Sequence, residues 1–298
     1  MTFSKKTEIT GHVGAIYSCV ATEDFIYSAS ADKHVVRWFV KDGTQDKFAI
    51  KFDHSVYCLE LIGDHLMAVG LSSGDLHFFD LKNNKEIKFF TQHKKAIFSL
   101  SFNSKKNQIY VGDAEGNFSI WDSISLELLI YLPLDCGKIR SINVSSSGEN
   151  FALTGQDGYL RIFESNYFNE ISSFYAHENG ATSVMFHPLD STKLISGGKD
   201  ALLKLWDWKN ESKLDEVVAH TFGIYDLLSI NNGENFISAS RDKNVKIWNS
   251  NTFSFLQRLD YKSGGHKHSV NALSKINETE FVSCSDDKKM VIWTQEID

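Results

Sequence analysis

One aromatic position recurs seven times along this chain at a nearly constant interval. Successive members are 41, 42, 42, 43, 42 and 45 residues apart, and the column runs Trp38, Phe79, Trp121, Phe163, Trp206, Trp248 and Trp293. A period of that length indicates repeated supersecondary units, each of which needs neighbours to bury its apolar faces. The 298 residues are therefore expected to fold as seven copies of one unit rather than as unrelated elements.

Each period consists of short stretches with strand-like alternation, separated by clusters of turn-forming residues. The sixth shows the order GIYDLLSI, NNGE, NFISAS, RDKN, VKIWN, SNT, FSFLQRL. Four strands in about 42 residues are typical of a propeller blade, and no helical 3.6-residue pattern is present. The sequence therefore predicts an all-β fold, a seven-bladed β-propeller of four-stranded antiparallel blades.

The periods also resemble the WD-repeat family. The residues that carry this resemblance are two Gly-His pairs and two Trp-Asp pairs, namely Gly11-His12, Gly265-His266, Trp121-Asp122 and Trp206-Asp207. The resemblance covers essentially the whole chain and implies one propeller domain over residues 1–298. Its expected repeats span approximately 1–40, 41–80, 81–122, 123–164, 165–207, 208–249 and 250–298.

The two ends of the chain are expected to share the last blade. Only five residues follow Trp293, too few for a further strand, whereas residues 2–9 suit one. We therefore expect the N-terminal strand to complete the seventh blade and close the ring, an arrangement that leaves no exposed seam.

Four repeats carry a His, a Ser, an Asp and a Trp at matching offsets. These sets are His12/Ser28/Asp32/Trp38, His177/Ser196/Asp200/Trp206, His220/Ser238/Asp242/Trp248 and His266/Ser283/Asp287/Trp293. A serine hydrolase would need one exposed nucleophile beside an oxyanion site, and none of these four serines stands in a Gly-x-Ser-x-Gly sequence, so no catalytic residue is predicted. A buried indole N–H needs an acceptor, and an Asp can orient an imidazole. The resemblance implies a structural hydrogen-bonded tetrad in each of these blades.

The other three repeats depart from this pattern. Repeat three keeps His93 and Trp121 but has Val111 and Glu115 at the Ser and Asp positions. In repeats two and four the aromatic residue is Phe and the Ser position is apolar, Val69 and Leu153 respectively. Because a Phe has no N–H to satisfy, we expect blades two and four to be held more by packing, and blades one, five, six and seven more by polar networks.

The resemblance also implies which residues line the mouth of the central channel. One set, the channel column, follows the first apolar position of each innermost strand: Tyr17, Tyr57, Phe98, Arg140, Thr182, Tyr225 and Asn271. We expect the same face to carry a second set, Lys138, Lys199, Arg241 and Asp286. Tyr and Arg are common anchors of protein interfaces. We predict a top-face site for a protein or peptide, with an acidic or phosphorylated segment facing the basic side. The alternative is that the aromatic residues merely plug the channel.

Composition and charge limit the partners, the location and the cofactors that we expect. With a net charge of −7, nucleic acid is not the expected partner, and no apolar run approaches the ~18 residues of a membrane helix. The N-terminus lacks a secretory signal, and the four cysteines are scattered without a C-x-x-C pair, so we expect a reduced, cytoplasmic protein. No cofactor or metal is predicted, because His266 and His268 have no further ligands at zinc spacing.

The predicted function is a non-enzymatic interaction scaffold or adaptor. The alternative is an enzyme or small-ligand binder that uses the central channel, although the channel column contains only Arg140 as a charged residue. A third possibility is a permanent subunit of a multiprotein complex. The sequence does not identify the partner.

Overall fold

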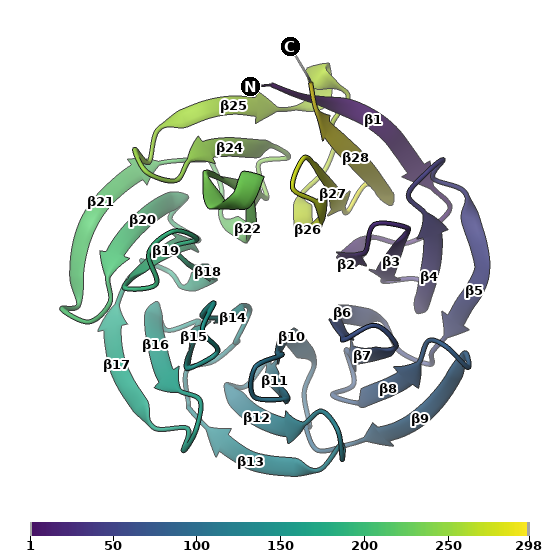
Figure 1. Cartoon of the computed structure of the whole chain (residues 1–298), viewed down its shortest axis with the longest axis horizontal. Helices are drawn as coiled ribbons and strands as arrows, with labels where there is room; N and C mark the ends of the chain where they lie inside the picture. The colour runs from purple at the N-terminus through teal and green to yellow at the C-terminus, as the bar shows by residue number, and fades with distance from the viewer. Residues whose placement is uncertain (1, 297–298) are drawn as a thin grey trace. The chain divides into compact units, whose positions relative to one another are not determined.

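The computed structural model describes residues 2–296, which form 28 strands and two short 3-10 turns, with no α-helix among them (Figure 1). The strands pair into seven four-stranded antiparallel sheets, which we number in chain order. The predicted fold class, a seven-bladed β-propeller, is confirmed. Met1, Ile297 and Asp298, at the ends of the predicted repeat array, lie outside the described residues.

The chain divides into two compact units, each of which we describe by itself. Unit 1 comprises Met1–Val56 and His220–Asp298, and unit 2 comprises Tyr57–Ala219. The prediction of a single domain with seven particular repeat boundaries stays a prediction.

Unit 1 contains sheets 1, 6 and 7. Sheet 1 has the order β2 (Ile16–Ala21), β3 (Phe25–Ser30), β4 (His34–Phe39), β5 (Gln45–Lys51). Sheet 6 has the order β22 (Ile224–Ile230), β23 (Asn235–Ser240), β24 (Val245–Asn249), β25 (Phe255–Leu259). Sheet 7 has the order β26 (Val270–Asn277), β27 (Glu280–Ser285), β28 (Lys289–Gln295), β1 (Phe3–Thr10). The turns are η1 (Asn231–Gly233) and η2 (Tyr261–Ser263).

The strand nearest the N-terminus pairs with the strand nearest the C-terminus. β1 lies antiparallel beside β28, with Phe3 opposite Gln295 and Thr10 opposite Lys289 (Figure 1). The Gln257 side chain of sheet 6 adds two hydrogen bonds of 2.8 Å to the backbone of Phe3. The prediction that the N-terminal strand completes the seventh sheet is confirmed.

Unit 2 contains sheets 2 to 5, except that β6 begins at Val56. Sheet 2 consists of β6 (Val56–Ile62), β7 (Leu66–Leu71), β8 (Leu76–Asp80) and β9 (Lys85–Phe90). Sheet 3 consists of β10 (Ile97–Asn103), β11 (Gln108–Asp113), β12 (Asn117–Asp122) and β13 (Leu128–Pro133). Sheet 4 consists of β14 (Ile142–Val144), β15 (Asn150–Thr154), β16 (Tyr159–Glu164) and β17 (Glu170–Tyr175). Sheet 5 consists of β18 (Ala181–Phe186), β19 (Lys193–Gly198), β20 (Leu202–Asp207) and β21 (Ser212–Val218).

Burial changes systematically across each sheet. The second strands are covered on both faces and read as nearly continuous apolar or small residues; every residue of β7, β11 and β23 is buried. The outermost strands are mostly exposed, and β9 and β21 carry Lys and Glu along their length. Charged side chains on an outer strand protect its unpaired edge against pairing with other chains.

Polar side chains join the first strands of neighbouring sheets within each unit. In unit 1 the carboxylate of Asp226 on β22 accepts a hydrogen bond from Leu273 N on β26 at 2.7 Å, and Ser274 Oγ accepts from Ala21 N on β2 at 2.9 Å. In unit 2, Asn143 Oδ1 accepts from Phe186 N at 2.9 Å. Backbone N–H groups that no strand partner satisfies thus find acceptors in the next sheet.

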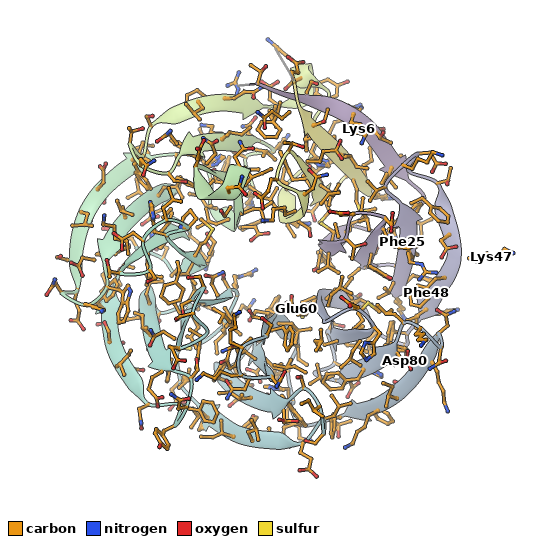
Figure 2. The ribbon with its side chains drawn as sticks, in the orientation of Figure 1. Lys6, Phe25, Lys47, Phe48, Glu60 and Asp80 are labelled. Atoms are coloured by element: carbon orange, nitrogen blue, oxygen red, sulfur yellow. The ribbon has the colours of Figure 1, made fainter. Side chains whose placement is uncertain are left out.

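Burial raises the pKa of two carboxyl groups on the inner strands, Asp226 and Glu60. Burial raises the pKa of Asp226 to about 7, and the hydrogen bonds from Leu273 and Leu227 only partly oppose this effect. Burial likewise raises the pKa of Glu60 to about 8. Asp226 and Glu60 are each half-buried as whole residues, and it is the carboxyl group of each that is enclosed. Glu60 lies on β6 and is labelled in Figure 2.

Candidate functional site

The four His/Ser/Asp/Trp sets each form one continuous hydrogen-bonded chain. In sheets 1, 5, 6 and 7 the Trp indole N–H donates to the Ser hydroxyl oxygen at 2.7–2.9 Å, and that Ser lies 2.7–2.9 Å from His Nε2. The His Nδ1 lies 2.7–3.1 Å from an Asp carboxylate. Because the Asp must accept, His Nδ1 carries the proton, and the Ser hydroxyl donates to Nε2.

The serines of these networks lie inside their sheets and are not available to a ligand. Each is completely inaccessible to solvent, with an exposed fraction of 0%, and the four are Ser28, Ser196, Ser238 and Ser283. An attacking hydroxyl must reach a substrate, and a binding residue must reach a partner. Ser196, Ser238 and Ser283 are internal hydrogen-bonding residues, the kind of role that the sequence pattern led us to expect: each accepts from one indole, of Trp206, Trp248 and Trp293 respectively.

The ionisation of the His and Asp members agrees with a structural network. Burial lowers the pKa of His177 and His220, so these imidazoles are neutral acceptors of the Ser proton. Burial opposes ionisation of Asp242, but hydrogen bonds from His220 and from backbone N–H groups bring its pKa to about 2. A neutral imidazole beside an ionised carboxylate gives each network one consistent set of donors and acceptors, from the indole through the hydroxyl and the imidazole to the carboxylate.

Sheet 3 contains a fifth network, in which His93 and Trp121 are joined by two residues that we did not predict, Ser119 and Asp113. His93 Nε2 lies 2.8 Å from Ser119 Oγ, the Trp121 indole N–H donates to the same oxygen at 2.8 Å, and His93 Nδ1 lies 2.9 Å from Asp113 Oδ2. The departures at Val111 and Glu115 therefore do not remove the network. They move its hydroxyl and carboxylate to other positions.

The strand register explains the move of the hydroxyl. In sheet 1, Ser28 on β3 faces Val36 on β4, whereas in sheet 3, Val111 on β11 faces Ser119 on β12. Serine and valine have exchanged places across one strand pair, so the hydroxyl keeps its depth in the sheet. In sheet 3, the serine opposite Val111 is the signal that would have revealed the network.

Sheet 4 has aromatic stacking where sheets 1, 3, 5, 6 and 7 have Trp and Ser. The Phe163 and Phe151 rings are stacked 5.1 Å apart with an interplanar angle of 4°, and Phe151 stacks in turn on Tyr110 of sheet 3 at 4.4 Å. Offset stacking of this kind adds stability beyond the area buried. In sheet 2, Val69 and Met67 are fully buried beside β8.

The predicted channel column coincides with an irregularity of the inner strands. In five sheets the register with the second strand shifts at the predicted residue, which is Tyr17, Phe98, Thr182, Tyr225 or Asn271. A β-bulge leaves its extra residue outside the ladder and redirects the side chain. The column is therefore set apart from the neighbouring strand positions by backbone geometry.

In unit 2 the structure brings five predicted residues together as a cationic-aromatic cluster, Tyr57, Phe98, Lys138, Arg140 and Lys199. The Phe98 ring stacks on Tyr57 at 5.2 Å, and both Lys138 Nζ (5.3 Å) and Arg140 Cζ (5.0 Å) lie over the Phe98 ring. Partial burial and repulsion from Arg140 and Lys138 lower the pKa of Lys199. Like charges therefore concentrate here around one aromatic ring.

Two other predicted residues make hydrogen bonds within the protein. Thr182 is buried and its hydroxyl donates to Gly197 O at 3.1 Å. In unit 1, Asn271 Nδ2 donates to Ile16 O and to Asp286 Oδ1, both at 2.8 Å.

The remaining members of unit 1 are partly accessible. The exposed Arg241 guanidinium lies 5.6 Å from the Phe222 ring centroid. Tyr17 and Tyr225 are half-buried on β2 and β22.

Comparison with known families agrees with this architecture. The family model described as WD domain, G-beta repeat matches residues 168–207, 211–249 and 257–294, and the model described as LRRK2 beta propeller matches residues 17–146. The chain is a WD-repeat protein. Proteins of this family are, as a rule, non-enzymatic scaffolds for protein interactions.

Several curated WD-repeat relatives are similar to this chain at low identity. Protein transport protein SEC31 of Kluyveromyces lactis is 26% identical over 85% of this chain and 22% of its own length. The U3 small nucleolar RNA-associated protein 15 homolog of Gallus gallus is 23% identical over 82% of this chain and 47% of its own. Guanine nucleotide-binding protein subunit beta-1 of Nicotiana tabacum is 24% identical over 61% of this chain and 51% of its own length. The chain thus matches between about a fifth and a half of each relative.

Within residues 2–296, no three His, Cys, Asp or Glu side chains gather as a metal site would require. The same residues include no helix long and apolar enough to cross a membrane.

Proposed function

We propose that this WD-repeat protein is a non-enzymatic scaffold that binds a protein or peptide partner through the cationic-aromatic cluster of unit 2. The observation that carries the proposal is the Phe98 ring, which stacks on Tyr57 and has Lys138 and Arg140 over it. Aromatic and Arg side chains at the ends of rigid strands are the usual anchors of an interface, and they lose little entropy on binding.

The charge of the cluster favours an acidic or phosphorylated partner segment. Within residues 2–296, neither Lys138 nor Lys199 has a carboxylate within 4.0 Å, so their ammonium groups are available to anionic oxygens. An Arg beside them can bind a carboxylate or phosphate through two parallel hydrogen bonds. We also propose a cytoplasmic location, which four free buried cysteines support.

Replacing Arg140 by glutamate is expected to weaken partner binding about tenfold or more, because repulsion replaces a charge-assisted contact at the centre of the cluster. The measurement is a peptide array probed with the full chain, followed by fluorescence anisotropy on the strongest peptides. Lys85→Glu is the matched control, since it makes the same charge change on the exposed strand β9 of the same unit. Binding that both variants retain equally would exclude the cluster as the site.

A further inference from the structure

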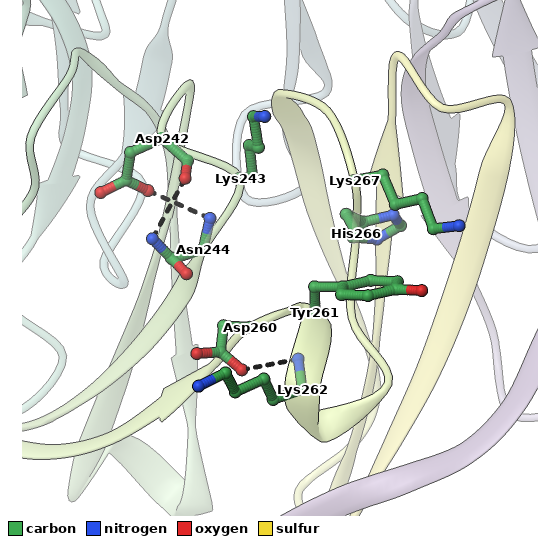
Figure 3. Close-up of a pocket in the computed structure, with 8 residues that line it drawn as sticks. All are labelled: Asp242, Lys243, Asn244, Asp260, Tyr261, Lys262, His266 and Lys267. Atoms are coloured by element: carbon green, nitrogen blue, oxygen red, sulfur yellow. Dashed lines mark hydrogen bonds between the residues drawn. The ribbon is translucent and has the colours of Figure 1, made fainter.

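A groove in unit 1 is lined by residues that the proposed function does not use. It has a volume of about 380 Å³ and lies between the β23–β24 turn and the segment that joins β25 to β26 (Figure 3). Its lining residues are Asp242, Lys243, Asn244, Asp260, Tyr261, Lys262, His266 and Lys267. This volume is within the range of sites that accept a small ligand or a few side chains of a partner.

One wall of the groove is the longest link between an outer strand and the next inner strand. Residues 260–269, ten in all, join β25 to β26, and the next longest link has eight residues, 134–141. The extra length is visible in the sequence as the 45-residue interval between Trp248 and Trp293. Long ordered links in a regular scaffold are a common location of binding residues.

The extra residues form a rigid turn rather than a loose loop. Asp260 Oδ1 accepts hydrogen bonds from Lys262 N (2.9 Å) and Ser263 N (3.2 Å), and Ser263 Oγ accepts from Asp260 N (2.8 Å). Gly264 then ends the turn at a φ of 84°, a value that glycine adopts at little cost. The backbone that carries Tyr261 and Lys262 is therefore fixed before any ligand arrives.

The groove contains positively charged side chains that no carboxylate of the described residues neutralises. Lys243, Lys262 and Lys267 are exposed, and within residues 2–296 none of their ammonium groups has a carboxylate within 4.0 Å. The two carboxylates of the lining are already engaged: Asp242 lies 2.9 Å from His220 Nδ1, and Asp260 lies 3.0 Å from the Arg258 guanidinium.

An aromatic side chain stands among these lysines. Tyr261 is 60% exposed, and Lys267 Nζ lies 4.9 Å from its ring centroid (Figure 3). The ring offers an apolar surface while its neighbour offers charge, and interface anchors commonly combine these two properties.

We propose that this groove binds an acidic segment of a protein partner. Carboxylate or phosphoryl oxygens of the segment contact Lys243, Lys262 and Lys267, and a neighbouring side chain packs on the Tyr261 ring. A peptide is favoured over nucleic acid because the chain carries a net charge of −7, which opposes a long polyanion. The site uses none of the residues of the cationic-aromatic cluster, so either proposal can fail alone.

The test compares two double variants of the full chain with equal changes in charge. Lys243→Glu/Lys267→Glu reverses two lysines of the groove, and Lys41→Glu/Lys47→Glu reverses two exposed lysines of unit 1 outside it; the Lys47 side chain points away from the ribbon (Figure 2). The probes are an array of 12-residue peptides with four or more Asp or Glu, their phosphoserine versions, and a 12-nucleotide single-stranded RNA. Fluorescence anisotropy then measures affinity for the strongest peptides.

We expect the groove variant to lose about tenfold in affinity for the selected peptides, and the control variant to change less than twofold. Tyr261→Ala is expected to lose about threefold with no change in net charge. Preference for carboxylate or phosphoserine peptides identifies the source of the anionic oxygens. Equal losses in both double variants, no peptide bound by the wild-type chain, or groove-dependent binding of the RNA alone would each overturn the proposal.

Discussion

Replacing Ser119 by alanine is expected to lower the free energy of unfolding by about 2–4 kcal/mol. Its hydroxyl accepts the Trp121 indole N–H and lies 2.8 Å from His93 Nε2, and all three side chains are buried. Alanine fills nearly the same space but leaves a buried donor and a buried acceptor without partners. That loss is larger than the loss of one ordinary hydrogen bond.

Urea denaturation followed by fluorescence measures this change. Ser104→Ala, at an exposed turn of the same sheet, is the control and should change stability by less than about 0.5 kcal/mol. The double variant Ser119→Ala/Trp121→Phe should cost less than the sum of its single changes, because the indole N–H that the first change orphans is removed by the second. A loss below about 1 kcal/mol for Ser119→Ala would mean that packing, not the network, holds sheet 3 together.

Replacing Asp226 by asparagine is expected to remove a dependence of stability on pH. The unfolded carboxyl ionises near its ordinary pKa of 3.8, whereas in the folded chain burial raises the pKa of Asp226 to about 7. Between these two values the unfolded state binds fewer protons than the folded state, so folding stability falls as pH rises from about 4 to about 7. Asparagine carries no charge to bury and retains an oxygen that can accept from Leu273 N.

We expect the stability of Asp226→Asn relative to wild type to improve by about 2–4 kcal/mol between pH 4 and pH 8. Chemical denaturation at a series of pH values measures the difference. Asp24→Asn, which removes an exposed acid of the same unit, is the control for the loss of one carboxyl group. Parallel stability curves for Asp226→Asn and wild type across this range would show that Asp226 is ionised in the folded chain throughout.

Sequence reasoning was sufficient for the repeat, the fold class and the shared seventh sheet. It was also sufficient to name the members of four networks, because these residues keep fixed offsets from the aromatic column. It missed Ser119 and Asp113, because a search at fixed offsets follows one strand and does not examine the strand opposite. It missed the groove of unit 1 as well, although the 45-residue interval marked where extra chain had been inserted.

What the sequence determined by itself is the number and kind of units, because a strand pattern with one aromatic residue per period can be buried in few ways. Only the tertiary structure decided which other side chains meet. Register placed Ser119 beside His93, bulges set the channel column apart from its strands, and a capped turn placed Tyr261 beside Lys267. These contacts depend on distances between segments that are far apart in the chain, and the order of residues along one strand does not contain those distances.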